Sequence, residues 1–273
     1  MKENTILEKK YTRLRHWLQE KEKVIIAFSG GVDSTTLLAA AVREKGVEVL
    51  ALIVESELMT QEENSFALNF LQKNNIPFQV LRLSLLENHT VQSNPPDRCY
   101  HCKLEIFKAI STLAKKENFP HILEGSNADD LKDYRPGKKA LEELHIESPL
   151  QELDFSKNEI RKLARHFDLP VWDRPSSPCL ATRFPAGVIL TEERLRALEI
   201  AESRLRNIGL KNLRLRLHDE TARLEVSPDE IGFCTDEKNR QKIIDIMKET
   251  GARYISLDLE GYRTGSMNTR EKE

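Results

Sequence analysis

The sequence lacks any run of about 20 apolar residues, the length that crosses a bilayer as a helix, so no membrane span is expected. Residues 1–23 also lack the continuous apolar core of a signal peptide. Basic residues are not in excess, because 42 Lys and Arg face 44 Asp and Glu and the net charge is −2. Such a chain has no general attraction to nucleic acid or anionic lipid. We therefore expect a cytoplasmic protein that binds neither membranes nor nucleic acid.

Cysteine is scarce, with four in 273 residues, and a reducing compartment disfavours structural disulfides. Cys99 and Cys102 stand in RCYHCK, Cys179 stands in SSPCLATR, and Cys234 has no partner motif. Zinc would need a fourth cysteine or histidine, and none lies at a suggestive spacing. Three cysteines without a fourth ligand suit a 4Fe–4S cluster with one open iron. A redox pair or two buried thiols would also explain a single CxxC.

Apolar strands alternate with helical patterns through the first part of the chain. The predicted strands are KVIIAF, VEVLALIVES, FQVLRLSLL and HILEGS, each followed by a helical segment. Continuous apolar strands in such an alternation are typical of a parallel sheet with helices on both faces. The sequence therefore predicts an α/β domain over residues 1–187, whose last part is a proline-rich, cysteine-bearing loop.

The remaining residues, 188–273, follow a different pattern. A charged amphipathic helix opened by Thr191 precedes LRLRL and ARLEV, which alternate strictly between apolar and polar residues. This alternation predicts half-buried strands with one polar face. A further helix and a strand follow, so we predict a small α+β domain.

The junction between the first strand and its helix reads SGGVDS, residues 29–34. A glycine pair lets backbone amides approach a ligand, and the amides and hydroxyls at a helix N-terminus form an anion cradle. Neither GxxxxGK(S/T) nor GxGxxG is present. A tight turn with Asp33 or Ser34 as helix cap would explain a glycine pair alone. The full string, however, resembles the PP-loop of ATP pyrophosphatases, which fall among the adenine nucleotide alpha hydrolase-like folds. That resemblance implies that the ATP phosphates are bound by Ser29, Gly30, Gly31, Asp33 and Ser34.

A second signature, EGSNADDLKDYRPG, resembles another motif of the same superfamily. Gly125 permits close backbone approach at the carboxyl end of a strand, where open α/β sheets bind ligands. Asn127 is expected to join the nucleotide site, and Asp129 and Asp130 are candidate magnesium ligands. A polar loop with Asx turns would explain the same residues. Lys157, at the start of a later helix, is predicted to contact phosphate, although solvated helix lysines are common.

Taken together, the PP-loop, DRCYHCK, EGSNADD, SPL and WDRPSSPCLATR resemble the LarE family, ATP-dependent sulfur transferases of nickel-pincer nucleotide synthesis. The resemblance implies that a carboxylate of pyridinium-3,5-biscarboxylic acid mononucleotide is adenylated and then attacked by sulfur. Some members have only the cysteine matching Cys179 and sacrifice its sulfur. The three cysteines here favour the cluster-bearing branch. Self-association is also implied, and the sulfur donor is left open between sulfide and a cysteine desulfurase.

Arginines of the second domain are candidates for substrate binding. Alternation places Arg214 and Arg216 on one strand face, where guanidinium groups suit a mononucleotide phosphate. Arg183, close to Cys179 in sequence, would bind the same phosphate or stabilise thiolate and adenylate charge. An exposed polar sheet face, which is common, would explain the same alternation, but the resemblance favours phosphate binding. The further candidates, as site carboxylates, are Glu202 and Glu225.

Three rival functions remain open from the sequence. A tRNA thiolase also joins a PP-loop to a three-cysteine cluster, but the near-neutral charge argues against an RNA-binding surface. An ammonia-dependent amidotransferase of the NAD synthetase type needs no cysteines. A nucleotide-binding regulatory protein without turnover would not need a complete PP-loop.

Overall fold

The computed structural model describes residues 2–132, 135–175 and 178–263. The chain forms two compact units: Met1–Leu85 with Asp97–Ser177, and Leu86–Pro96 with Pro178–Glu273. This division differs from the predicted boundary at residue 187. The segment 86–96 and the residues from 178 onward fold with the second unit, because backbone hydrogen bonds described below join them.

The first unit contains a four-stranded sheet in which all strands are parallel, in the order β3-β2-β1-β4. The strands are β1 (Lys23–Ala27), β2 (Glu48–Glu55), β3 (Phe78–Arg82) and β4 (His121–Leu123). The helices of this unit are α1 (Lys2–Gln19), α2 (Val32–Ala41), α3 (Gln61–Lys73), α5 (Arg98–Lys116), η2 (Ala128–Lys132), α6 (Gly137–Glu143), α7 (Pro149–Glu152) and α8 (Lys157–His166). The predicted α/β class, with a parallel sheet covered by helices, is confirmed.

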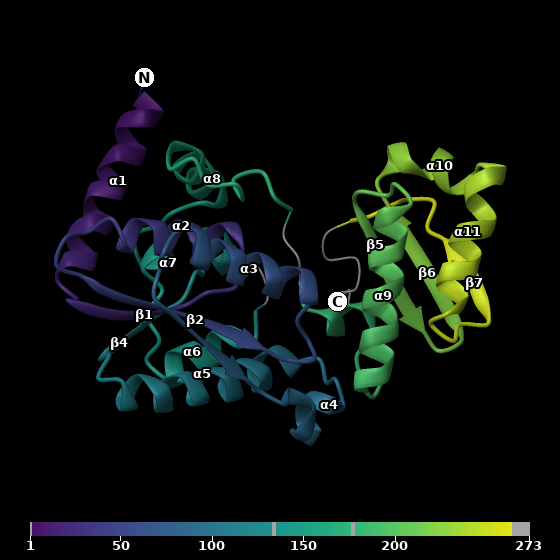
Figure 1. The fold of residues 1–273 in the computed structure, drawn as a ribbon, viewed down its shortest axis with the longest axis horizontal. Helices are drawn as coiled ribbons and strands as arrows, with labels where there is room; N and C mark the ends of the chain where they lie inside the picture. Colours follow the sequence, from purple (N-terminus) through teal and green to yellow (C-terminus); the bar gives the residue numbers. More distant parts are fainter. Residues whose placement is uncertain (1, 133–134, 176–177, 264–273) are drawn as a thin grey trace. The chain divides into compact units, whose positions relative to one another are not determined.

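Alternate strand residues build two hydrophobic layers. On β1, Val24 and Ile26 pack into the layer formed with α1, α2, α3, α7 and α8, whereas Ile25 packs into the layer formed with α5 and α6. Figure 1 shows α5 and α6 on one side of the sheet and α1, α2 and α8 on the other. Full burial of each such side chain stabilises the fold by about 1.5–3 kcal/mol. The near-continuous apolar strands therefore follow from burial of both sheet faces.

The second unit contains a three-stranded sheet, β5-β6-β7, in which β5 and β6 are antiparallel and β6 and β7 are parallel. The strands are β5 (Leu213–His218), β6 (Thr221–Val226) and β7 (Tyr254–Leu257). The helices are α4 (His89–Gln92), which follows η1 (Leu85–Glu87), then η3 (Leu180–Arg183), α9 (Glu192–Asn207), η4 (Pro228–Glu230), α10 (Ile231–Thr235) and α11 (Glu237–Lys248). Thr191 caps α9 by accepting a hydrogen bond from the Arg194 amide, as its position predicted.

The alternative explanation of the alternation, an exposed polar face on β5 and β6, does not hold. Arg216 is 5% exposed and Glu225 is fully buried. These two side chains pair across neighbouring strands, and Arg216 also donates to the Thr182 carbonyl in η3. Strict alternation correctly indicated that the strands have two different faces. The polar face can be buried because the charges of Arg216 and Glu225 neutralise one another.

Residues 86–96 are joined to the second unit by hydrogen bonds around Asn94. The Gly187 amide donates to the Asn94 carbonyl at 2.7 Å, and Asn94 Nδ2 donates to the Pro185 carbonyl at 2.8 Å. The Leu190 amide donates to the Gln92 carbonyl at 2.8 Å. Asn94 is 1% exposed and has a left-handed backbone with φ of 53°.

Among the residues that the structure describes, no helix combines the length and apolar character needed to cross a membrane.

We predict that Asn94→Ala lowers the free energy of unfolding by about 2–4 kcal/mol. It loses a buried hydrogen bond, worth about 1–3 kcal/mol. It also replaces asparagine, which tolerates a left-handed backbone, by alanine, which tolerates it less well at a cost of about 1 kcal/mol. Asn94→Gly tolerates that backbone and isolates the loss of the side chain. Asn75→Ala is the matched control, because Asn75 is exposed and has φ of 52°. Denaturant titrations that give the same loss for Asn94→Ala and Asn75→Ala would contradict the role of the buried amide.

Candidate active site

The predicted phosphate loop, residues 29–34, lies between β1 and α2. Gly30 has φ of +71°, and a β-carbon there would lie 3.2 Å from Phe66 Cδ1, so both conformation and space favour glycine. Ser34 Oγ accepts from the Ser29 amide at 3.3 Å and lies 3.1 Å from Ser29 Oγ. Gly31 is the N-cap residue of α2, and no side chain of the described residues caps this helix. The first-turn amides are thus arranged as an anion cradle, and neither Asp33 nor Ser34 serves as the N-cap.

Gly125 brings the end of β4 against this loop. A β-carbon on Gly125 would lie 2.9 Å from the Ser34 amide nitrogen and 3.2 Å from Ser34 Cα. The pairing of β4 with β1 in parallel register produces this close approach. The structure therefore brings together two motifs that are separated by about 90 residues in the sequence.

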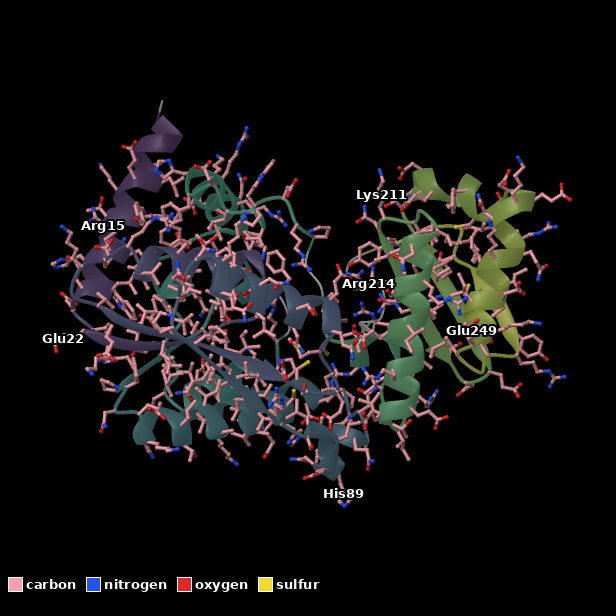
Figure 2. All side chains as sticks on the ribbon, in the orientation of Figure 1. Arg15, Glu22, His89, Lys211, Arg214 and Glu249 are labelled. Atoms are coloured by element: carbon pink, nitrogen blue, oxygen red, sulfur yellow. The ribbon has the colours of Figure 1, made fainter. Side chains whose placement is uncertain are left out.

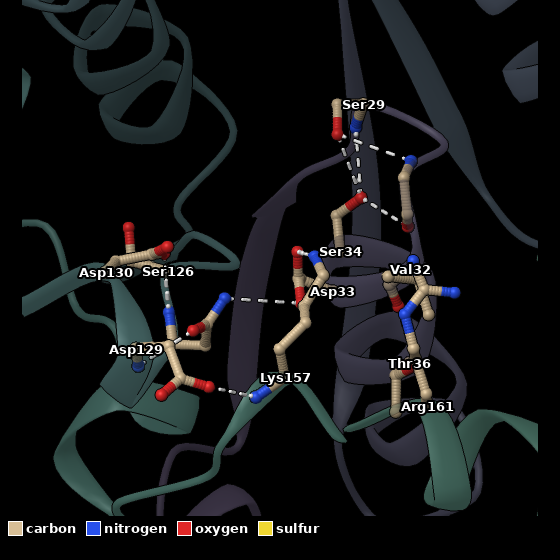
Figure 3. Close-up of polar contacts among 12 residues, drawn as sticks. Ser29, Val32, Asp33, Ser34, Thr36, Ser126, Asp129, Asp130, Lys157 and Arg161 are labelled. Carbon is tan, nitrogen blue, oxygen red and sulfur yellow. Dashed lines mark hydrogen bonds and ion pairs between the residues drawn. The ribbon is translucent and has the colours of Figure 1, made fainter. Parts of the chain in front are cut away.

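Asp33 and Lys157 form an ion pair at the start of α2. Lys157 is the first residue of α8, whose start is fixed by a capping box between Ser156 and Glu159. Asn127 Nδ2 lies 3.5 Å from the other Asp33 oxygen. Burial raises the pKa of Asp33 above its ordinary value, and Lys157 only partly opposes this shift. Figure 3 shows Lys157 pointing from α8 toward Asp33.

Asp129 and Asp130 lie in the loop that follows Gly125. Asp129 accepts from the Lys157 amide at 2.8 Å, which connects this loop to the start of α8. Asp130 accepts from the Asn127 amide at 3.0 Å and pairs with Arg135 at 2.8 Å. Both the predicted Asx-type turn contacts and proximity to the phosphate loop are present (Figure 3). A role as magnesium ligands stays a prediction.

Cys99 and Cys102 lie one helical turn apart at the start of α5, and therefore on one face. Cys99 is exposed and Cys102 is partly buried. Arg98 is buried, and its guanidinium donates to Cys99 Sγ at 3.5 Å. Gly137 lets α6 approach, because a β-carbon there would lie 3.2 Å from the Cys99 carbonyl.

Cys179 precedes η3 in the second unit and is held there by Arg183. The Arg183 guanidinium donates to the Pro178 and Cys179 carbonyls at 2.5 and 3.1 Å. It is fully buried and forms two further bonds with the Glu202 carboxylate, at 3.1 and 3.2 Å. Arg183 thus orders the backbone at Cys179, and its positive charge is neutralised by Glu202.

The other predicted arginines of the second unit differ from one another. Arg216 forms two bonds with Glu225, at 3.1 and 3.0 Å, so its charge is matched. Arg214, which extends from β5 (Figure 2), lies with its guanidinium 5.0 Å from the centre of the Tyr262 ring. Burial lowers the pKa of Arg214, and Arg183 acts in the same direction. Phosphate binding by Arg214 and Arg216 stays a prediction.

Sequence reasoning missed three residues around the nucleotide loop. Glu124 is buried at the end of β4 and accepts from Ser148 Oγ at 2.5 Å. It also pairs with Lys103 of α5 at 3.5 Å, which connects the helix that carries two cysteines to the strand that carries Gly125. Arg135, the partner of Asp130, stands in the quoted RPG. For the pair of Glu124 with Lys103, the only signal in the sequence was the position of Lys103 directly after Cys102.

No three His, Cys, Asp or Glu side chains within residues 2–132, 135–175 and 178–263 gather closely enough to form a metal site.

Comparisons with known proteins agree with this geometry. A family model described as a PP-loop domain matches residues 3–134. The pyridinium-3,5-bisthiocarboxylic acid mononucleotide synthase of Lactiplantibacillus plantarum is 35% identical over 255 residues, covering 92% of this chain and 91% of that protein. An uncharacterized protein of Synechocystis is 35% identical over 263 residues, covering 96% and 98%. The tRNA-specific 2-thiouridylase MnmA of Leptospira biflexa is 27% identical over 205 residues, covering 59% and 52%.

Gly125→Ala tests the close approach at the phosphate loop. The added β-carbon would collide with backbone atoms of Ser34, which cannot rotate away, so we expect a loss of about 1–3 kcal/mol in stability. We also expect weaker ATP binding, because the first turn of α2 must shift. Calorimetric titration with ATP measures this effect. Gly232→Ala is the control, since nothing lies within 4 Å of the added carbon. Unchanged ATP affinity in Gly125→Ala would show that the contact does not shape the loop.

The Arg183–Glu202 pair predicts a pH dependence of stability. Burial pushes the pKa of Glu202 upward, but Arg183 and the Leu215 amide outweigh it, so the pKa lies below its ordinary value. The stabilisation is therefore complete above the unfolded-state pKa of about 4.3. It is lost as pH falls through the lower folded-state pKa.

Glu202→Gln should remove this acid dependence and cost about 3–5 kcal/mol at neutral pH, because Arg183 stays buried without its partner charge. Glu193→Gln, an exposed position on the same helix, should change little. Unfolding curves measured from pH 3 to 7 test both statements. Equal stability of Glu202→Gln and the parent at pH 7 would refute them.

Proposed function

The chain belongs to the LarE family of ATP-dependent sulfur transferases, and on that premise we propose that it thiolates a carboxylate of pyridinium-3,5-biscarboxylic acid mononucleotide. The premise rests on 35% identity over nearly the full length of the Lactiplantibacillus synthase. We infer the substrate from the name of that relative, which describes a product with thiocarboxylates in place of carboxylates.

The chemistry begins with activation of the carboxyl group. A carboxylate resists attack by sulfur, because its negative charge repels nucleophiles and oxide is a poor leaving group. Attack of a carboxylate oxygen on the α-phosphorus of ATP forms an acyl adenylate and releases pyrophosphate. Attack of sulfur on the acyl carbon then expels AMP, which leaves with that oxygen. The single observation that carries this proposal is the phosphate loop, in which Gly31 is the N-cap residue of α2 and no side chain of the described residues caps the helix.

Residues around the loop have complementary roles in the first step. The amides of residues 30–34 and the Ser29 and Ser34 hydroxyls receive the phosphate oxygens. Lys157 adds positive charge where pyrophosphate departs, and such preorganised charge is worth more in a site that excludes water. ATP phosphate and the Asp33 carboxylate compete for the same ammonium group.

Magnesium fits the donor set beside the loop. Proteins usually hold this hard cation through one or two carboxylates together with substrate phosphates, and Asp129 and Asp130 would supply the carboxylates. When bound, the ion would neutralise charge that develops on the departing pyrophosphate.

A 4Fe–4S cluster fits the thiols of this chain in number and type. Cys99 and Cys102 share one helix face, Cys99 is exposed, and Arg183 orders the backbone at Cys179. When bound by these three cysteines, the cluster would present one iron able to carry sulfide.

Three further features belong to the same proposal. We place the protein in the cytoplasm as a self-associating enzyme that acts on a small nucleotide. Its sulfur donor is sulfide or a cysteine desulfurase.

The test is a comparison of cysteine variants in anaerobic assays. We predict that Cys99→Ala, Cys102→Ala and Cys179→Ala each lose thiocarboxylate formation, while pyrophosphate release still depends on the carboxylate substrate. Cys234→Ala is the matched control, because burial raises the pKa of the Cys234 thiol to about 11 and keeps it protonated. Iron and acid-labile sulfide are counted in each preparation. Normal thiolation by protein that lacks the first three cysteines would exclude the cluster, and absence of carboxylate-dependent pyrophosphate release would exclude adenylation.

A further inference from the structure

Arg161 holds the chain segment that leads toward Cys179. Its guanidinium donates to the Trp172 carbonyl at 2.7 Å and to the Arg174 carbonyl at 2.8 Å. A planar fork that binds two carbonyls in this way fixes both position and direction of the segment. Arg161 itself is held by α8, a helix with a capping box at its start.

Arg161 also lies at the nucleotide site. It follows Lys157 by four residues and therefore shares its helix face. Figure 3 shows both side chains rising from α8 toward the first turn of α2. The positive charge of Arg161 lowers the pKa of Asp33, as the charge of Lys157 does, although burial outweighs both. Within the described part of the chain, no carboxylate forms an ion pair with Arg161.

Arg174 approaches the same loop from the other direction. Its guanidinium lies 4.4 Å from the centre of the Phe66 ring. Phe66 in turn packs beside Gly30, since its Cδ1 lies 3.2 Å from the position of a β-carbon there. The ion pair of Arg174 with Glu62 is long, at 3.9 Å, and Glu62 is 65% exposed. An exposed pair of this kind contributes little, so Arg174 can exchange it for a stronger anion.

We propose that Arg161 and Arg174 are additional binding residues for the ATP phosphates, and that ATP thereby fixes residues 172–174 at the rim of the phosphate loop. The two guanidinium groups flank a cradle whose own cation, Lys157, is engaged by Asp33. A triphosphate carries more negative charge than one lysine balances, and guanidinium binds phosphate through paired hydrogen bonds. The ligand class is a nucleoside triphosphate or the pyrophosphate that it releases.

The consequence concerns sulfur delivery, and in this respect the inference rests on the proposed function. Cys179 follows Arg174 by five residues. Occupancy of the phosphate loop would thus add contacts to residues 172–174, which precede Cys179 in the sequence and which Arg161 already holds.

The experiment uses the full chain with ATP and magnesium, and no carboxylate substrate. Calorimetric titration measures ATP affinity, and hydrogen exchange measures the protection of residues 171–175 with and without ATP. We expect Arg161→Ala and Arg174→Ala each to weaken ATP binding about tenfold, the loss of one charge-assisted contact. ATP should slow exchange of this segment in the parent protein and not in these variants. Arg161→Lys should recover part of the affinity, because it keeps the charge, but not the protection.

Lys162→Ala is the matched control. Lys162 is an exposed residue of the same helix, and its removal makes the same change in charge. Its ATP affinity and protection should equal those of the parent. Unlike Arg161, the Arg174 side chain has no role in the proposal as a holder of backbone carbonyls. If Arg174→Ala bound ATP as tightly as the parent protein and showed the same protection, the proposal would be overturned. Because neither readout requires a carboxylate, failure of the proposed function would show separately, as intact ATP binding without carboxylate-dependent pyrophosphate release.

Discussion

The contact between Gly125 and the first turn of α2 is the constraint on which the nucleotide site depends. Parallel pairing places β4 beside β1, and the absence of a side chain at residue 125 lets backbone meet backbone at Ser34. Asn127 and Asp129 follow directly, so the same contact brings their loop to Asp33 and to the start of α8. Any larger residue at position 125 would separate the two motifs that together form the site. The phosphate cradle is therefore a property of the sheet edge, and not of the glycine-rich loop alone.

The two units use arginine in opposite ways. In the second unit, Arg183 and Arg216 are buried and matched by Glu202 and Glu225. Buried pairs of this kind contribute little net stability but are costly to break, so their value lies in fixing geometry, here the backbone at Cys179. In the first unit, Arg161 binds carbonyls and its charge faces the nucleotide site. A guanidinium that is not matched by a buried carboxylate has charge to offer a phosphate.

Much of the fold and part of the site were predictable from local sequence. SGGVDS identified the phosphate loop because a strand, a glycine pair and a helix are contiguous, and the apolar strands identified a doubly covered sheet. Long-range pairing was not predictable. Nothing in the alternation of Arg216 indicates that its side chain pairs with Glu225, which lies diagonally across on β6. Nothing near Asn94 indicates that it donates to the Pro185 carbonyl. For that reason the two compact units differ from the predicted division at residue 187. The hydrogen bonds of Arg161 with the carbonyls of residues 172 and 174 could not be predicted from the sequence either, because they depend on the path of the chain after α8.

The central claim is that ATP activates a carboxyl group by transferring AMP to it. The most direct measurement supplies the mononucleotide substrate with oxygen-18 in its carboxylates and analyses the released AMP by mass spectrometry. If the carboxylate oxygen attacks the α-phosphorus and sulfur later displaces AMP from the acyl carbon, each AMP carries one labelled oxygen. Unlabelled AMP, or label recovered in inorganic phosphate, would contradict the account.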